Sequence, residues 1–222
     1  MEEKIVKLPI NTNEKFMQNK KCDYKVLAIM TLYSKFTPMN KQEESGTYEQ
    51  YRYVYKNKII EFTDEIEKLS QKKINTIMKN MRALSNINEG ELVTACKNES
   101  GEIYYTINYA NGTTGNKFVT IDSDMLRALV DAFSSNSIKI YVFLKYMCKD
   151  GERKITRSYI AKSIGLTGSN DSLKTISNCT KALCGAGFIN KRKVYKNDSE
   201  INCEVYYSIT TREEWKERRM QI

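Results

Sequence analysis

The fold is decided by the stretch KITRSYIAKSIGLTGSNDSLKTISNCTKALCGAGFINKRKVY, residues 154–195. Apolar residues at helical spacing predict a short helix over Arg157–Ile164, and Gly165 suits the C-terminal cap that ends it. A Ser/Thr-rich turn follows. From Asn170 or the next residue, both good N-cap types, the spacing predicts a second helix as far as about Cys184. The centre of this region is therefore a pair of helices joined by a tight turn.

The flanking elements complete a larger pattern. Upstream, Ser137–Cys148 predicts a largely buried helix, because apolar residues occupy most of its positions. Downstream, Phe188–Lys196 alternates in the manner of a strand, and its partner is Cys203–Thr210 across a turn at Lys196–Ser199. Helix, helix, turn, helix and hairpin is the order of elements in a winged helix-turn-helix domain.

The first half of the chain repeats this pattern. The segment TIMKNMRAL (76–84) matches TISNCTKAL (175–183) in four letters at an offset of 99, which is 175 minus 76. Further on, YYTI (104–107) matches YYSI (206–209) at an offset of 102. Upstream, KLPINTNEKF resembles KFVTIDSDML at a larger offset, as an insertion in the first copy would produce. The repeat predicts two copies of one module.

These patterns predict an α+β fold, mainly helical, of two tandem winged helix-turn-helix domains. The N-terminal domain is predicted over 1–112, with an inserted strand or hairpin at about 40–58. The C-terminal domain is predicted over 113–222 and ends in a short helix. The boundary is placed within 110–117, a Gly/Asn/Thr stretch of the kind that joins domains.

The first copy departs from the second at two points. Its initial helix is predicted over about Tyr24–Phe36, and its helix pair over Asp64–Leu69 and Gln71–Leu84, but the link within the pair lacks the Gly-Leu-Ser/Thr turn. Its insertion predicts a strand in which tyrosines largely alternate with other residues, namely Tyr48, Tyr51, Tyr53 and Tyr55. The alternation fits a sheet face packed on its own domain, and it also fits a surface for a partner or a dimer strand.

The run from Ile155 to Tyr195 resembles the winged-helix family. The shared features are a helix ending in Ala-x-x-Ile-Gly-Leu, a Ser/Thr-rich turn, and Gly-Phe-Ile before a basic wing. Tandem copies, with Leu8-Pro-Ile-Asn and Ile121-Asp-Ser-Asp leading into the initial helices, resemble replication initiators of low-GC Gram-positive plasmids and phages. The resemblance implies double-stranded DNA as the partner, although regulators and partition proteins share these motifs.

The distribution of charge agrees with a nucleic-acid partner. The net charge is +9, and no acidic residue occurs from Ser172 to Asn197 or between Glu67 and Glu89. Both stretches hold a predicted second helix with several cations, and a merely solvated face would usually mix the two signs. The residues predicted to contact DNA are Lys72, Lys73, Asn75, Thr76, Lys79, Arg82, Arg157, Ser172, Lys174, Thr175, Asn178, Lys181, Lys191, Arg192 and Lys193.

Groove geometry suggests roles for these residues. A recognition helix enters the major groove, so Asn75 and Asn178 suit adenine and Thr76 and Thr175 suit a thymine methyl group. Lys174 and Arg82 suit guanine or phosphate. The wing cations, residues 191–193, are predicted to contact the backbone or the minor groove and to set the salt dependence.

Several absences argue against catalysis. The chain has no histidine, which removes the usual general base and the commonest zinc ligand. The glycines of Gly112–Lys117 are too close together for a phosphate-binding loop. Six scattered cysteines without a Cys-x-x-Cys pair predict free thiols and no metal site. No apolar run is long enough for a signal peptide or a membrane span, so we expect a cytoplasmic protein without cofactor that is not an enzyme.

Four functional hypotheses remain at this point. The first is a plasmid or phage replication initiator that binds repeated origin sites and recruits host replication proteins. The second is a transcriptional regulator, or repressor, of a mobile element. The third is a nicking enzyme that uses Tyr159 or Tyr195, and the fourth is a protein-interaction module. The tail Arg212–Ile222, with the only tryptophan, Trp215, is predicted to form a short helix that packs on the body or contributes to a homodimer.

Overall fold

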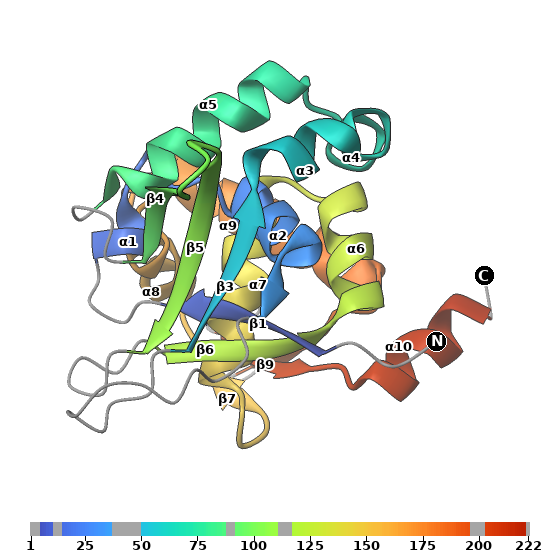
Figure 1. The fold of residues 1–222 in the computed structure, drawn as a ribbon. Helices are drawn as coiled ribbons and strands as arrows, with labels where there is room; N and C mark the ends of the chain where they lie inside the picture. Colours follow the sequence, from blue (N-terminus) through green and yellow to red (C-terminus); the bar gives the residue numbers. More distant parts are fainter. Residues whose placement is uncertain are drawn as a thin grey trace, which may run out of the picture. The chain divides into compact units, whose positions relative to one another are not determined.

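The computed structural model describes residues 5–10, 15–36, 50–87, 92–110, 117–195 and 203–220. Helices and small antiparallel sheets make up the described part, which confirms the α+β class. The chain divides into two compact units, Met1–Ser135 (unit 1) and Asn136–Ile222 (unit 2). Figure 1 colours the elements along the chain, from blue at the N-terminus to red at the C-terminus.

Unit 1 contains a four-stranded sheet, in the order β2-β3-β5-β4, and a separate two-stranded ribbon of β1 and β6. In Figure 1, β3 and β5 run side by side as the cyan and green arrows. The elements of unit 1 are β1 (Ile5–Ile10), α1 (Lys15–Gln18), α2 (Tyr24–Tyr33), β2 (Lys35–Phe36), β3 (Gln50–Tyr55), α3 (Lys56–Glu61), α4 (Thr63–Ser70), α5 (Ile74–Ser85), β4 (Val93–Lys97), β5 (Ile103–Ala110), β6 (Lys117–Asp122) and α6 (Ser123–Ala132).

The core of unit 1 surrounds α2, in which every residue from 24 to 31 is buried. The helix begins where the carboxylate of Asp23 accepts hydrogen bonds from the backbone N–H groups of Lys25 and Val26, which satisfies two donors of the first turn. α5 turns the apolar side chains of Ile77 and Met81 inward at helical spacing. The opposite side of α5 therefore faces away from the core.

Unit 2 contains a three-stranded sheet, in the order β7-β9-β8, with helices packed against it. Its core includes Tyr141 and Leu183, which are fully buried. Gly165 has a left-handed backbone (φ 81°), as the predicted cap requires. The elements are α7 (Ser135–Met147), whose first residue belongs to unit 1, β7 (Arg153–Lys154), α8 (Arg157–Ser163), α9 (Asn170–Gly185), β8 (Ile189–Tyr195), β9 (Cys203–Ile209) and α10 (Arg212–Met220).

The tail predicted as a helix is α10, and it packs on unit 2. Trp215 is buried, and its ring lies 5.5 Å from the ring of Phe188, centroid to centroid. The guanidinium of Arg218 donates a hydrogen bond to the side-chain oxygen of Asn190 at 2.9 Å. Gly187 has a left-handed backbone (φ 74°) that favours glycine, and a Cβ there would also lie 3.2 Å from Cδ of Arg218.

The elements of unit 2 confirm the secondary structure predicted from the sequence to within two residues at each end. In unit 1 the initial helix is shorter than predicted, because α2 ends at Tyr33 and Lys35–Phe36 forms β2. The sheets also support the repeat. Without β3, the sheet of unit 1 has the order β2-β5-β4, which corresponds element by element to β7-β9-β8 of unit 2.

Unit 1 extends well beyond the predicted boundary after residue 112. β6 pairs with β1 along its whole length, from Ile5 opposite Asp122 to Ile10 opposite Lys117. α6 also packs in unit 1, where Arg127 donates a hydrogen bond to Glu65 of α4 at 2.6 Å. The chain divides after Ser135 instead, since pairing between distant strands leaves no local mark in the sequence. Residues 111–116 of the predicted linker lie outside the described residues.

The strand predicted in the insertion is β3, a central strand of the unit 1 sheet. Its residues alternate as predicted, because Arg52 and Val54 are buried while Tyr53 and Tyr55 are half-exposed. The guanidinium of Arg52 donates hydrogen bonds to the hydroxyl and carbonyl oxygens of Ser34 at 2.6 and 3.0 Å. Residues 40–49, including Tyr48, lie outside the described part of the chain, as does the side chain of Tyr51.

Candidate nucleic-acid interface

Helix α9 presents a polar, cationic face at the surface of unit 2. Its N-cap is Ser169, whose hydroxyl accepts a hydrogen bond from the backbone N–H of Ser172. Ile176, Thr180 and Leu183 are buried against the unit. The exposed positions at helical spacing from one another include Lys174, Asn178 and Lys181.

A groove of about 1110 Å³ separates α9 from the hairpin of β8 and β9. It brings together five of the residues predicted to contact DNA, namely Arg157, Asn178, Lys181, Lys191 and Lys193. Arg157 is oriented by a hydrogen bond of 3.0 Å from its guanidinium to the hydroxyl of Ser177. The single acidic residue of the lining, Glu204, forms an ion pair with Lys154. The four predicted cations therefore give the groove an excess of positive charge. We call it the cationic groove.

The cations of this groove act on one another. Partial burial lowers the pKa of Lys191 below its usual value, and the nearby charges of Lys193 and Arg157 lower it further. A group that is both desolvated and surrounded by like charge is less stable in its charged form. An anion bound in the groove would relieve this cost, as a DNA phosphate does when it neutralises a lysine.

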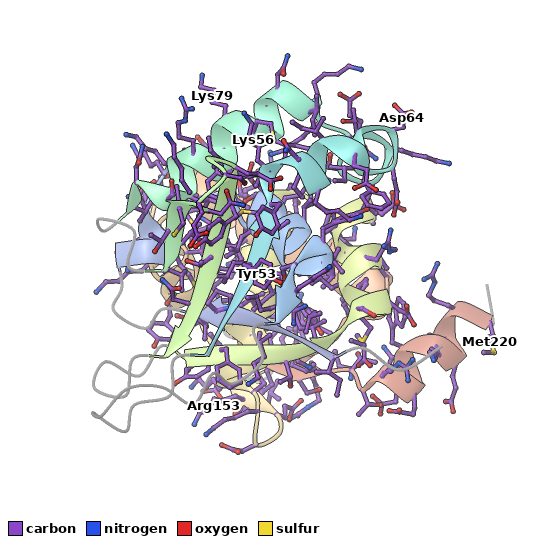
Figure 2. The ribbon with its side chains drawn as sticks, in the orientation of Figure 1. Tyr53, Lys56, Asp64, Lys79, Arg153 and Met220 are labelled. Carbon is purple, nitrogen blue, oxygen red and sulfur yellow. The ribbon has the colours of Figure 1, made fainter. Side chains whose placement is uncertain are left out.

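In unit 1, α5 presents the equivalent face. Asn75, Thr76, Lys79 and Arg82 are all exposed, and positions 75, 79 and 82 share one side of the helix. Figure 2 labels Lys79, which projects from the outer side of α5. The helix begins where a carboxylate oxygen of Glu67 accepts a hydrogen bond from the backbone N–H of Ile74 at 2.8 Å. The left-handed cap that Gly165 provides in unit 2 is formed here by Gln71, whose φ is 56°.

Two cations at the start of α5 are paired within unit 1. The ammonium of Lys72 forms an ion pair with Asp23, the N-cap of α2, and Asn80 donates to the same oxygen at 2.9 Å. Lys72 therefore ties the segment before α5 to the start of α2, and its contact with DNA stays a prediction. Lys73 forms an ion pair with Glu67 at 2.9 Å, and this hydrogen bond raises the pKa of Lys73. The side chain of Lys73 is 85% exposed and stays accessible.

Three predicted residues of α9 lie outside the lining of the cationic groove. Ser172, predicted to contact DNA, is instead buried, and its hydroxyl lies within hydrogen-bond distance of those of Thr167 and Ser169. The hydroxyl of Thr175 donates to the backbone oxygen of Asp171 at 2.9 Å, which leaves the methyl group for contacts. Lys174 is exposed at the surface of α9, outside the lining of the cationic groove.

Arg192 lies apart from its two neighbours, and its contact with DNA stays a prediction. It lies on the opposite face of the sheet from Lys191 and Lys193, because side chains alternate along a strand. There its guanidinium forms an ion pair with Glu152 and lies 4.9 Å from the centre of the Tyr206 ring. The sequence held a signal for this: in a predicted strand, residues 191 and 193 point to one face of the sheet and residue 192 points to the other.

Sequence reasoning missed the residues that hold this site in place. Ser177 orients Arg157, and Glu67 and Asp23 fix the start of α5 and the position of Lys72. Sequence reasoning also missed that the hairpin turn of unit 1 is acidic. That turn holds Glu99 and Glu102 and is closed by a hydrogen bond from the backbone N–H of Asn98 to the carbonyl of Glu102. No periodic pattern marks these contacts, which join segments from different elements.

The remaining features concern thiols, metal ions and membranes. All six cysteines are free thiols. Within the described ranges, no group of three or more Cys, Asp or Glu residues is placed to hold a metal ion. No helix in the same ranges has the length and apolar character needed to cross a membrane. Comparison of the chain with family models, with curated proteins and with solved structures finds no match.

Proposed function

We propose that this chain belongs to the class of winged helix-turn-helix proteins that bind double-stranded DNA, with one module in each unit. The order of helix, strand, helix, helix and hairpin in unit 2 supports this proposal, and unit 1 has the same order apart from the additional β3 and α3. The strand order of the unit 1 sheet, which differs from that of unit 2 by the insertion of β3, supports it as well. The observation that carries it is the cationic groove, where Arg157, Lys181, Lys191 and Lys193 converge beside the polar face of α9.

In the proposed complex, α9 lies in the major groove and Asn178 reaches a base edge. The cations of the cationic groove hold the phosphates of the adjacent backbone, which positions the helix without reading sequence. In unit 1, α5 makes the equivalent contact through Asn75 and the cations Lys79 and Arg82. The hairpin turn of unit 1 holds Glu99 and Glu102, so we assign its phosphate contacts to the helix rather than to the wing.

Within this class we propose a particular role, that of a replication initiator of a plasmid or phage. Two reading modules on one chain suit a long site made of repeated elements, because each module contacts a few base pairs in one groove. In this role the protein binds repeated origin DNA and recruits host replication proteins without chemistry of its own. The support is the internal repeat and the resemblance of tandem modules to such initiators.

Selection of bound fragments from the parent replicon tests both steps of the proposal. Sheared replicon DNA is incubated with the full chain, the bound fragments are sequenced, and their protected positions are mapped by footprinting. We expect protected direct repeats, bound cooperatively. The matched control is the Lys181→Ala/Lys191→Ala protein, which should recover far less of the same DNA because two phosphate contacts are lost.

The outcomes separate the alternatives. A single protected palindrome over a promoter would replace the initiator by a transcriptional regulator while leaving DNA binding intact. Equal recovery by the control variant would contradict the DNA-binding assignment of the groove and favour a protein-interaction module. If supercoiled plasmid were nicked, or became covalently attached to the protein, after incubation with the chain and a divalent metal ion, the protein would be a nicking enzyme.

A further inference from the structure

The sheet of unit 1 has an outer face rich in tyrosine. Cross-strand register places Tyr53 opposite Thr106, Tyr55 opposite Tyr104, and Lys35 opposite Tyr53, so these side chains share one face of the sheet. Thr94 and Cys96 of β4 extend that face across β5. We call the set Lys35, Tyr53, Tyr55, Tyr104, Thr106, Thr94 and Cys96 the tyrosine face.

The rings form one continuous aromatic surface. The centroids of Tyr53 and Tyr55 lie 5.8 Å apart, and those of Tyr55 and Tyr104 lie 5.5 Å apart. All three side chains are half-exposed. The buried residues of β3, Arg52 and Val54, lie on the other face. The rings are thus supported by the sheet beneath them while part of each remains open to contact.

The charges on this face are positive, while Glu102 lies beyond its edge at the β4–β5 turn, where its carboxylate accepts a hydrogen bond from Asn57 at 2.9 Å. Lys35 lies on it and is exposed, and Lys56 follows directly where α3 begins. Figure 2 labels Tyr53 on β3 and Lys56 at that junction. Among the described residues whose register places them on this face, none is acidic. The surface therefore offers aromatic rings and cations together, which complement bases joined by phosphates.

The second module lacks this surface. On the corresponding face of the unit 2 sheet, the ring of Tyr206 is covered by Arg192, whose guanidinium pairs with Glu152. Lys154 and Glu204 form a further ion pair there. The aromatic rings of unit 1 come largely from β3, the strand that has no counterpart in unit 2. The tyrosine face is thus an addition to the repeated module rather than a part of it.

We propose that the tyrosine face binds single-stranded DNA by stacking bases on Tyr53, Tyr55 and Tyr104. Aromatic residues on the open face of a four-stranded sheet stack two or three unpaired bases in one class of nucleic-acid-binding domain. Duplex DNA does not suit the face, because its bases are already stacked on one another. The choice of DNA over RNA rests on the proposed function, which places the chain on DNA.

The test measures binding of fluorescein-labelled oligo-dT, about 15 nucleotides long, by the full chain at raised salt, where phosphate contacts are weakened. We expect the Tyr53→Thr/Tyr55→Thr protein to lose at least about tenfold in affinity, because stacking on an aromatic ring contributes that much per base. Threonine keeps the strand propensity of β3. The matched control, Tyr53→Phe/Tyr55→Phe, keeps the rings and should bind within about threefold of the parent protein.

Several results would overturn this proposal. One is equal binding of oligo-dT by the threonine variant, and another is a comparable loss in the phenylalanine variant. Tighter binding of oligo-U than of oligo-dT would show an RNA surface. A change of oligomeric mass in the threonine variant, with oligo-dT binding unchanged, would show a contact between copies of this chain.

Duplex binding is measured in parallel on the same proteins. It should be unchanged by the tyrosine substitutions and lowered by Lys181→Ala/Lys191→Ala. If the parent protein binds oligo-dT through its tyrosines but does not bind duplex, the proposed function fails and this inference stands. If it binds duplex but shows no tyrosine-dependent binding of oligo-dT, this inference fails and the proposed function stands.

Discussion

Replacing Lys181 and Lys191 with alanine should reduce the salt dependence of duplex binding, whereas replacing Arg192 should not. All three are basic residues of the region predicted to contact DNA. Lys181 and Lys191 line the cationic groove, while Arg192 lies on the opposite face of the sheet in an ion pair with Glu152. The comparison therefore tests the position of each charge rather than its sign.

The magnitude follows from the number of phosphates that the groove neutralises. Each neutralised phosphate contributes about −0.9 to the slope of log K against log salt concentration, so the four groove cations contribute about −3.6 and the double substitution leaves about −1.8. Between about 50 and 200 mM salt, the contribution of the groove to affinity falls about 150-fold in the parent and about 12-fold in the variant. The expected change in slope is therefore about 1.8 units.

Fluorescence anisotropy of a labelled duplex at several salt concentrations measures this slope. The Arg192→Ala protein is the matched control, because its exposed ion pair contributes little to stability and its charge faces away from the groove. A slope for Arg192→Ala as shallow as that of the double variant would refute the assignment of the groove. So would an unchanged slope in the double variant.

Three further predictions concern stability. Lys72→Ala should lower the free energy of unfolding by about 1–2 kcal/mol, because Lys72 forms an ion pair with Asp23, and it should leave the salt slope of duplex binding unchanged. The control is the exposed Lys79, whose replacement by alanine should change the free energy of unfolding by less than about 0.5 kcal/mol. Leu183→Ala should cost about 2–5 kcal/mol in urea titration, since the side chain is fully buried. Hydrogen bonds from Arg127 and Tyr33 lower the pKa of Glu65, so the stability that this group contributes is lost as pH falls below its usual pKa of 4.5. Glu65→Gln should remove that part of the acid sensitivity.

Each of these predictions has a contradicting result. Loss of salt dependence in Lys72→Ala, with stability unchanged, would place that residue in the DNA interface. A cost below about 1 kcal/mol for Leu183→Ala would contradict the packing of α9. For Glu65, the contribution is small because the side chain is 45% exposed, and an equal fall in stability on acidification in both proteins would exclude it.

The sequence was enough to predict the elements of unit 2 and the exposed sides of α5 and α9. Helical spacing places Ile176 and Leu183 on the buried side of α9 and Asn178 and Lys181 on the exposed side, and the structure agrees. The pattern is local, because helix geometry alone relates residues three and four apart. The same holds for Arg52 and Tyr53, which alternate along β3 as any strand requires.

Only the tertiary structure decided which cations are committed within the units and where the chain divides. Lys72 meets Asp23, which is 49 residues away, and Arg192 meets Glu152, which is 40 residues away. The pairing of β1 with β6 likewise joins segments more than 100 residues apart. Such contacts depend on which elements pack together, and that choice is made by the summed burial of the whole unit rather than by the spacing of residues along any one segment.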